Sequence, residues 1–238
     1  MANATADIAG GIVQLGFLAT SVAQHVTNSG TLNISADATA NAYNTAVANA
    51  GVEWGVLQVG FGGAYASGTV NNMAGGNMTI AANANADGNA AFANAQVGGS
   101  PLAQGIGQLE IANVAHAYVT NDGTLTIGAI ANANGNTYAS ANAFVDGIGQ
   151  GVLGGDSGAA SVDNAGTLDV DATAHAVAAS GPAFAHAAVS YGISQNVDAF
   201  TAAANVNNAL SGTIDIGAIA KATGTQAGAQ FSLSLIHI

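Results

Sequence analysis

The stretch Asn28-Ser-Gly-Thr-Leu-Asn-Ile-Ser-Ala-Asp-Ala-Thr-Ala-Asn-Ala42 decides the fold prediction, because apolar and polar residues alternate strictly along it. Leu32, Ile34 and the alanines share one parity, and the Asn, Ser, Asp and Thr residues from Asn33 onward share the other. Alternation with a period of two indicates a β-strand with one buried side and one solvent-facing side. The Asn-x-Gly that begins the stretch predicts a turn, since both residue types tolerate positive φ.

The same turn-and-strand cassette occurs five times along the chain. Its glycines are Gly30, Gly76, Gly123, Gly166 and Gly212. They are separated by 46, 47, 43 and 46 residues. A second motif, Gly-[Ile/Val]-x-Gln, precedes each cassette and ends 15 to 18 residues before its glycine. The glutamines of this motif are Gln14, Gln58, Gln108, Gln150 and Gln195. Two markers that keep phase over five copies indicate an internal repeat.

Each repeat contains four strand-like segments: Gly-Ile-x-Gln, a segment ending in Val-x-Asn, the Thr-Leu-x-Ile-x-Ala segment, and a second alanine alternation such as 138–144. We therefore predict an all-β fold, a parallel β-helix (β-solenoid) built from five repeats of about 46 residues, as one domain over residues 1–232. Each repeat is expected to make two turns, and five repeats would give a rod roughly 50 Å long. The residues expected to form the first inward ladder are Leu32, Met78, Leu125, Leu168 and Ile214. The next inward ladder is expected at Ile34, Ile80, Ile127, Val170 and Ile216.

Two other folds fit part of the pattern. Alanine is the best helix former, but the large apolar residues recur at every second position and no Glu-Lys pairs support a helix. Four strands in about 45 residues also describe the blade of a β-propeller. Propeller blades pack with bulky and aromatic residues, whereas this chain has alanine tracks and the single tryptophan Trp54.

Composition excludes several functions. The net charge is −12, and Lys221 is the only basic residue among 238, so nothing can neutralise phosphates. Nucleic-acid binding and attraction to an anionic membrane surface are therefore not expected. The chain contains no cysteine, which excludes disulfides and thiolate metal sites. The first residues carry no positively charged signal region, and no run reaches the ~20 apolar residues of a membrane span, so no membrane insertion is expected.

Three groups of polar residues are candidate sites. The turn asparagines could form a ligand-contacting row or an amide ladder that hydrogen-bonds from layer to layer, and the ladder is favoured. These asparagines are Asn28, Asn72, Asn121, Asn164 and Asn208. Asp169, Asp171 and Asp215 occupy the polar side of the third segment, where paired carboxylates could serve glycoside hydrolysis or contact calcium. A solvated surface explains them without a ligand, because other copies carry Asn, Ser or Thr there.

The histidines do not form a metal-binding pattern. Apart from His237 in the C-terminal segment, they are His25, His116, His175 and His186. None lies in a spacing such as His-x-x-x-His, and His175 has the outward parity of its segment. We therefore predict no catalytic, cofactor-binding or metal-binding residue and no cofactor.

The C-terminal segment Leu233-Ser-Leu-Ile-His-Ile238 breaks the repeat pattern. It resembles the translation of a transposon-end sequencing adaptor. We therefore set residues 233–238 apart as a non-native tail and expect residues 1–232 to be a fragment of a longer protein.

The recurring Val-x-Asn-x-Gly-Thr-Leu/Ile-x-Ile with alanine alternation resembles the β-strand repeats of large bacterial surface proteins, the autotransporter passengers and filamentous-haemagglutinin-like adhesins. The resemblance covers residues 8–232 and implies a secreted, extracellular stalk on a Gram-negative cell surface, used for adhesion or matrix building. Implied partners are glycans or proteins of a host surface or matrix, and other copies of the same protein. The alternatives are a polysaccharide-acting β-helix enzyme, disfavoured by the absence of Arg, and a glycan- or ice-binding module.

Overall fold

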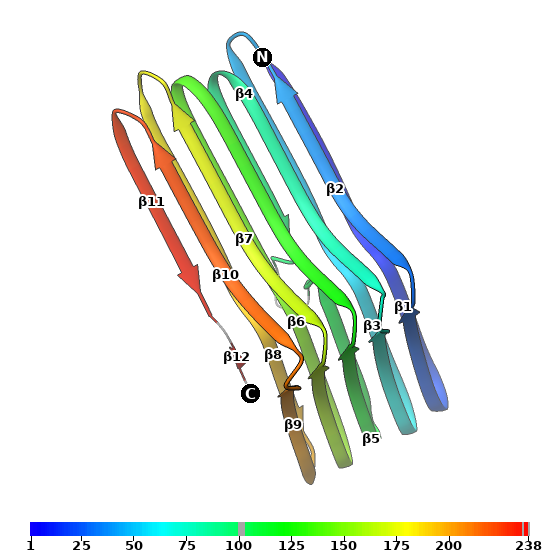
Figure 1. Ribbon diagram of the computed structural model, residues 1–238. Helices are drawn as coiled ribbons and strands as arrows, with labels where there is room; N and C mark the ends of the chain where they lie inside the picture. Colours follow the sequence, from blue (N-terminus) through cyan, green and yellow to red (C-terminus); the bar gives the residue numbers. More distant parts are fainter. Residues whose placement is uncertain (100–102, 235, 238) are drawn as a thin grey trace.

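The computed structural model describes residues 1–99, 103–234 and 236–237, and every regular element in this part of the chain is a β-strand (Figure 1). The strands are β1 Ala2–Asn28, β2 Thr31–Asn41, β3 Thr45–Asn72, β4 Asn77–Val97, β5 Ile106–Asn121, β6 Thr124–Asn164, β7 Thr167–Ala178, β8 Pro182–Asp198, β9 Thr201–Asn208, β10 Thr213–Thr223, β11 Gln226–Leu233 and β12 Ile236–His237. Hydrogen bonds join the strands into one sheet, and the pairings among them are parallel. The predicted all-β, parallel class is therefore confirmed, and the architecture is consistent with a β-solenoid.

Pairing occurs between residues one repeat interval apart. Leu32 pairs with Met78, which pairs with Leu125, and across the structure paired residues are 42 to 50 positions apart. The expectation of two turns per repeat is therefore wrong: one pass of the chain around its path, here called a rung, consumes the whole interval. Since rungs lie ~4.8 Å apart, the stack is about half as long as expected.

The rung is wide because its four segments form two flat layers. One layer contains the Val-x-Asn segment and, beyond the Asn turn, the Thr-Leu segment, as in the end of β1 followed by β2. The other layer contains the second alanine segment followed by Gly-Ile-x-Gln, as in the first part of β3. Figure 1 shows these long strands side by side, with the connecting turns at the two ends of the strands in each rung. Several segments run on without a break, so β6 alone spans 41 residues.

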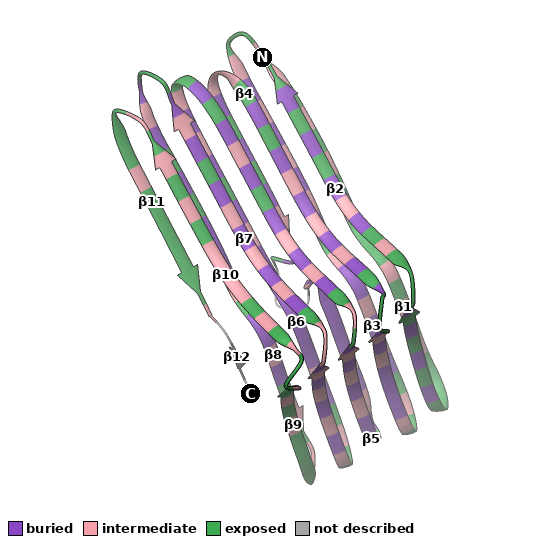
Figure 2. Ribbon diagram, viewed as in Figure 1, coloured by how far each residue is buried: buried purple, intermediate pink, exposed green. Residues whose placement is uncertain are grey.

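Alanine fills the space between the layers over the Thr-Leu half of each rung. Ala36 and Ala38 from one layer and Ala46 and Ala48 from the other belong to one buried cluster. The alternation of buried and less buried residues is visible along β2, β4 and β7 in Figure 2. Small side chains let the two layers approach closely, so alanine alone fills the thin space between them. The predicted Leu/Met ladder is buried at its interior members, from Met78 to Leu168, and partly buried at the first and last rungs.

The glycine of Gly-Ile-x-Gln lies directly against side chains of the opposite layer. A Cβ placed on Gly55 would stand 2.6 Å from the Ile80 side chain of the other layer and 2.5 Å from the carbonyl oxygen of Gly105 in the next rung. Both distances are too short for any side chain. The motif therefore needs glycine because the second inward ladder, to which Ile80 belongs, packs against its backbone.

The C-terminal residues continue the parallel ladder where the structure describes them. Leu233 ends β11, and Ile236 pairs with Ile193 through β12. Residues 235 and 238 of the tail lie outside the described residues, and its predicted adaptor origin stays a prediction. Among the described residues, no helix is long and apolar enough to cross a membrane.

Candidate functional site

The predicted asparagine ladder at the turn is confirmed. Each Nδ2 donates to the Oδ1 of the asparagine one rung later at 2.7 to 2.8 Å, from Asn28 through to Asn208. The same Nδ2 atoms also donate to backbone carbonyls, as Asn121 does to Thr167 at 2.8 Å. The interior members are 1 to 2 % exposed. Their amides are occupied and buried, so these residues hold the turn in register and offer no ligand-contacting row.

A second ladder, of glutamines, lies between the layers and was not expected from the sequence. The Nε2 of each motif glutamine donates to the Oε1 of the glutamine one rung earlier at 2.7 to 2.8 Å. The other proton of Gln108 Nε2 goes to the Tyr118 carbonyl in the opposite layer at 3.1 Å. Gln58, Gln150 and Gln195 make the same bond across the layers. The glutamines therefore tie rung to rung and layer to layer.

Glu110 lies beside this ladder, two residues after Gln108 on the inward side of β5. Its exposed fraction is 0 %, and neither carboxyl oxygen has a hydrogen-bond partner. The carboxyl group fills the space above Gly60 and Gly68 of the preceding rung, where a Cβ on either glycine would collide with it. Burial raises the pKa of Glu110 to about 8, because ionising it would place an unpaired charge between the layers.

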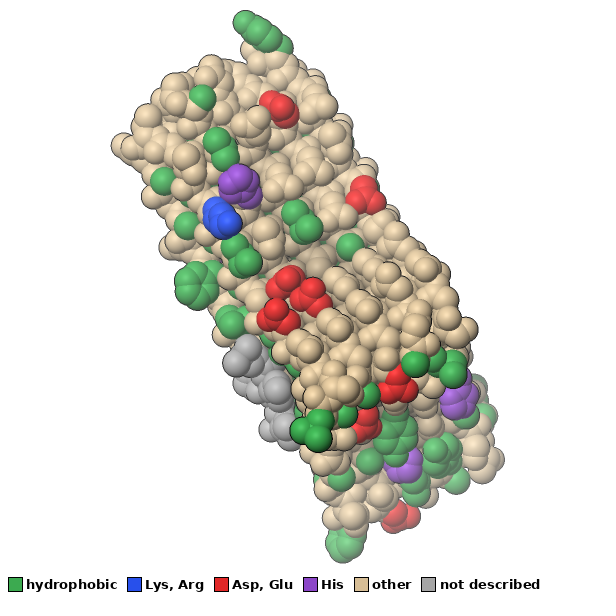
Figure 3. Space-filling view, viewed as in Figure 1, with side chains coloured by type: hydrophobic (Ala, Val, Ile, Leu, Met, Phe, Trp, Pro, Cys, Tyr) green, Lys and Arg blue, Asp and Glu red, His purple; other side chains and the backbone are tan. Residues whose placement is uncertain are grey.

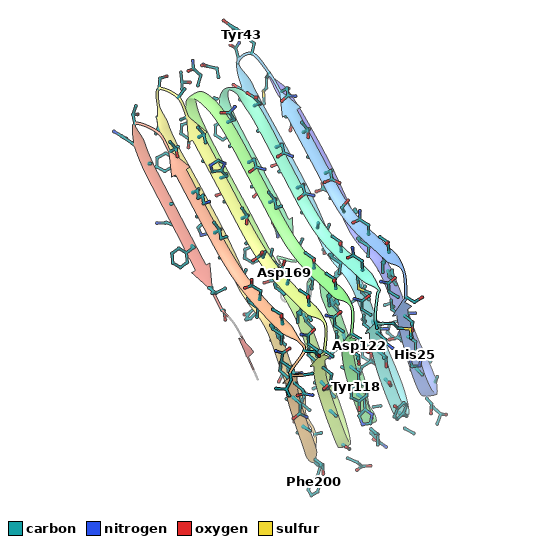
Figure 4. The ribbon with its side chains drawn as sticks, viewed as in Figure 1. His25, Tyr43, Tyr118, Asp122, Asp169 and Phe200 are labelled. Carbon is teal, nitrogen blue, oxygen red and sulfur yellow. The ribbon has the colours of Figure 1, made fainter. Side chains whose placement is uncertain are left out.

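The three aspartates of the candidate site meet on the exposed side of the Thr-Leu layer. Asp169 of β7 pairs in register with Asp215 of β10, and Asp171 follows on the same strand (Figure 4). Figure 3 shows a group of acidic side chains in the middle of a face that is otherwise largely uncharged. Desolvation and then the neighbouring Asp169 carboxylate raise the pKa of Asp171 to about 6. Desolvation also raises the pKa of Asp169, whose Oδ1 has no hydrogen-bond partner.

The geometry of these aspartates does not match the chemistry that their spacing suggested. No group of three or more His, Cys, Asp and Glu side chains within the described ranges is arranged to hold a metal ion. Asp169 and Asp171 are two residues apart on strand β7, where the Asp169 carboxylate raises the pKa of Asp171. Carboxylates that act as acid and nucleophile instead flank a bound substrate.

The histidines remain apart. His116 packs edge-on against Tyr65 at 5.6 Å between ring centroids and tilts against Tyr118 at 5.5 Å. His175 is exposed, as its parity predicted, and pairs in register with Lys221. His25 lies in β1, at the N-terminal end of the stack (Figure 4).

An apolar surface covers the outer side of the Gly-Ile-x-Gln segments, here called the outer Gln-strand face. Its outward residues by rung are Val13, Leu15 and Phe17; Leu57, Val59 and Phe61; Gly107, Leu109 and Ile111; Gly149, Gly151 and Leu153; and Ser194, Asn196 and Asp198. Leu15 and Phe17 are 57 % and 52 % exposed. Where glycines replace the bulky residues, the face has a hollow of about 310 Å³ next to Leu57, Val59 and Leu109.

Comparison of the chain with protein-family models, with curated proteins and with solved structures finds no match in any of the three. The ladders and surfaces above are therefore the basis for any functional argument.

Proposed function

We propose that this chain is a structural and adhesive β-solenoid segment of a secreted bacterial cell-surface protein, built from five repeats of about 46 residues. It would act as a passive stalk in adhesion or in an extracellular matrix. The observation that carries the proposal is the pair of buried amide ladders, of asparagine and of glutamine, which run through successive rungs.

The ladders support a load-bearing role because each amide bonds to the rung before it and the rung after it. Asn121 accepts from Asn72 at 2.8 Å and donates to Asn164 at 2.7 Å. Separating two rungs breaks these bonds together with the backbone ladder and exposes buried polar groups. Each polar group left unsatisfied by such a break costs about 1–3 kcal/mol. Stacked repeats of this kind resist opening through the sum of many nearest-neighbour contacts.

The exposed side of the Thr-Leu layer is a polar surface made mostly of amides and hydroxyls. Outward side chains also bond between rungs, as Asn83 does to Asp37 at 2.6 Å and Asn132 to Asn85 at 2.9 Å. A surface of this kind stays hydrated with few ions, in keeping with the 6 % of charged residues. It would present hydrogen-bonding groups to glycans or proteins of a host surface or matrix.

The two alternatives have less support. A polysaccharide-acting enzyme needs acids that flank a substrate, whereas Asp169 and Asp171 are neighbours on one side of the same strand. A glycan platform needs open aromatic faces. The rings of Phe92, Tyr138 and Phe184 pack at 5.1 and 6.0 Å with tilts of 32° and 47°, so they do not form one flat aromatic face.

The proposal is tested by asking whether the chain adheres to a surface without releasing sugar from it. Beads coated with the full chain are washed under flow over host-surface and matrix glycans and proteins, and soluble sugars are measured in the effluent. We expect retention on at least one surface and no released sugar. Release of oligosaccharides that Asp169→Asn abolishes would establish the enzyme alternative. No retention on any surface would refute the adhesive role.

A further inference from the structure

The hollow on the outer Gln-strand face lies over two columns of residues that pair from rung to rung. The first column is Leu57, Gly107, Gly149 and Ser194, and the second is Val59, Leu109, Gly151 and Asn196. In each column a large apolar residue begins the series and a small polar residue ends it, with glycine between them. The space of about 310 Å³ is therefore bounded by apolar side chains at one end and by polar side chains at the other.

The larger part of the hollow has an apolar lining. This lining consists of Trp54, Leu57, Val59 and Leu109. Between these side chains, Gly107 and Gly151 pair in register with the rungs on both sides, so their backbone polar groups are taken up by the sheet. A hydroxyl group buried against them would lack a hydrogen-bond partner, which costs affinity. This part of the hollow therefore favours a hydrocarbon chain over a sugar ring.

The other part of the hollow carries three polar side chains, which are Gln104, Ser194 and Asn196. The Gln104 side chain lies across Gly149, where a Cβ on that glycine would collide with it. Amide and hydroxyl groups can donate to or accept from an uncharged head group. Small-molecule sites generally combine mostly apolar walls with a few polar groups that fix the ligand's orientation, and this hollow is at the lower end of their size range.

Charge distinguishes a neutral ligand from an anionic one. None of the described residues that line the hollow is charged. Lys221, the one Lys or Arg of the chain, is exposed on the Thr-Leu layer, and the net charge is −12. A carboxylate in the hollow would lose hydration without a cation beside it and would be repelled by the rest of the chain. A fatty-acid anion should therefore bind less well than an uncharged amphiphile.

We propose that this hollow binds a small, uncharged amphiphile. The alkyl chain lies along the apolar lining, and the neutral head group hydrogen-bonds to the three polar side chains. From Leu57 to Ser194 there are three rung intervals of ~4.8 Å, about 14 Å in all, which suits a short chain with its head group. The site is separate from the polar surface to which the proposed function assigns adhesion, so either proposal can fail without the other.

The first test uses the fluorescence of Trp54, which lines the hollow and is the only tryptophan of the chain. The full chain is titrated with n-octyl-β-D-glucoside below its critical micelle concentration, with methyl-β-D-glucoside and with octanoate. We expect a saturable emission shift to shorter wavelength with octyl glucoside and none with methyl glucoside, which has the head group without the chain. Octanoate should bind at least roughly tenfold more weakly. No response to octyl glucoside, or equal responses to any two of the compounds, would overturn the proposal.

The second test separates a defined site from general coating of the apolar face. Gly151→Leu fills the hollow, and a Cβ there would stand 3.1 Å from Leu109 Cδ1, the end of a side chain that can turn away. Leu15→Asn is the matched control, because Leu15 is 57 % exposed on the same face and does not line the hollow. Circular dichroism confirms that each variant keeps its β structure.

The two variants should change octyl glucoside binding in a way that coating cannot produce. We expect at least a roughly tenfold loss of affinity for Gly151→Leu and no change for Leu15→Asn. Coating would give the opposite order, because Gly151→Leu adds apolar surface to the face and Leu15→Asn removes it. That order, or equal affinities of both variants, would refute a binding site in the hollow.

Discussion

Replacing Glu110 by glutamine removes a fully buried carboxyl group that has no hydrogen-bond partner. The pKa of Glu110 is raised from 4.5 to about 8 in the folded chain. Between these values the unfolded chain has lost the proton that the folded chain keeps. Stability contributed by this group is therefore greatest in acid and falls as the pH rises through this window. The variant has no proton to lose, so this part of the pH dependence should disappear.

The magnitude follows from the width of the window. Each pH unit between the two pKa values removes about 1.4 kcal/mol of unfolding free energy. The variant should be more stable than the native chain by about 1 kcal/mol near pH 5.5 and about 3 kcal/mol near pH 7. Above about pH 8 the difference should stop growing, because both states are then ionised. Glutamine fits the site in shape, and its amide lies within the glutamine-lined interior around Gln58 and Gln108.

Urea unfolding followed by far-ultraviolet circular dichroism measures this difference across the pH range. A gain of 3 kcal/mol corresponds to a shift of about 1 M in the urea midpoint for a chain of this size. Glu53→Gln is the control, because Glu53 is the chain's other glutamate and is exposed. A difference between the Glu110 variant and the native chain that does not change with pH, or that equals the Glu53 control, would refute the reasoning.

Four further outcomes follow from the same structure. Asn121→Ala should lower the unfolding free energy by about 3–5 kcal/mol, and Asn208→Ala by about 1 kcal/mol. Of these two residues, Asn121 bonds to an asparagine on each side, whereas Asn208 bonds to one. Equal losses in urea unfolding would contradict the ladder. Gly105→Ala should cost about 1–3 kcal/mol through contact with the opposite layer at 2.5 Å, whereas Gly30→Ala meets nothing within 4 Å and should be near neutral in thermal unfolding. Asp171→Asn should stabilise the chain by less than about 1 kcal/mol above pH 6 and leave it unchanged in strong acid, because the raised pKa lowers stability as the pH rises. A melting temperature raised by calcium would contradict the absence of a metal-binding group among the described aspartates.

The Thr-Leu segments could be predicted because their alternation is carried by residues that differ strongly. Leu125 and Ile127 point inward while Thr126 points outward, and the structure repeats this side assignment in each rung. The asparagine ladder could also be predicted, since Asn before a glycine turn has few other roles when it recurs at one register. Both features are local, so spacing alone identifies them.

The width of a rung was beyond this kind of reasoning. Nothing local distinguishes a repeat that turns twice from one that makes a single wide, two-layered turn, because both have the same strand pattern. The difference lies in which segments face each other. Ala36 and Ala46 lie in opposite layers and belong to the same buried cluster. Only the pairing register of strands that are distant in the sequence shows this arrangement.

The inward position of Glu110 did have a signal in the sequence. It shares the parity of Gln108, and a glutamine kept at one register among varying neighbours is typical of an interior ladder rather than of a surface. Gly60 and Gly68 provide the space that the Glu110 carboxyl group occupies, and an alanine at either position would remove it.

The two amide ladders run in opposite directions along the stack. Asparagine Nδ2 atoms donate to the later rung, whereas glutamine Nε2 atoms donate to the earlier one. The amide dipoles of the two ladders therefore point in opposite directions along the axis. Because of these donation directions, Gln195 Oε1 at the last rung is buried without a hydrogen-bond partner. Asn208 Nδ2 at the same end donates only to the turn carbonyl of Gly212. A rung stacked there would supply a donor to one ladder and an acceptor to the other, so each added rung should stabilise the one before it.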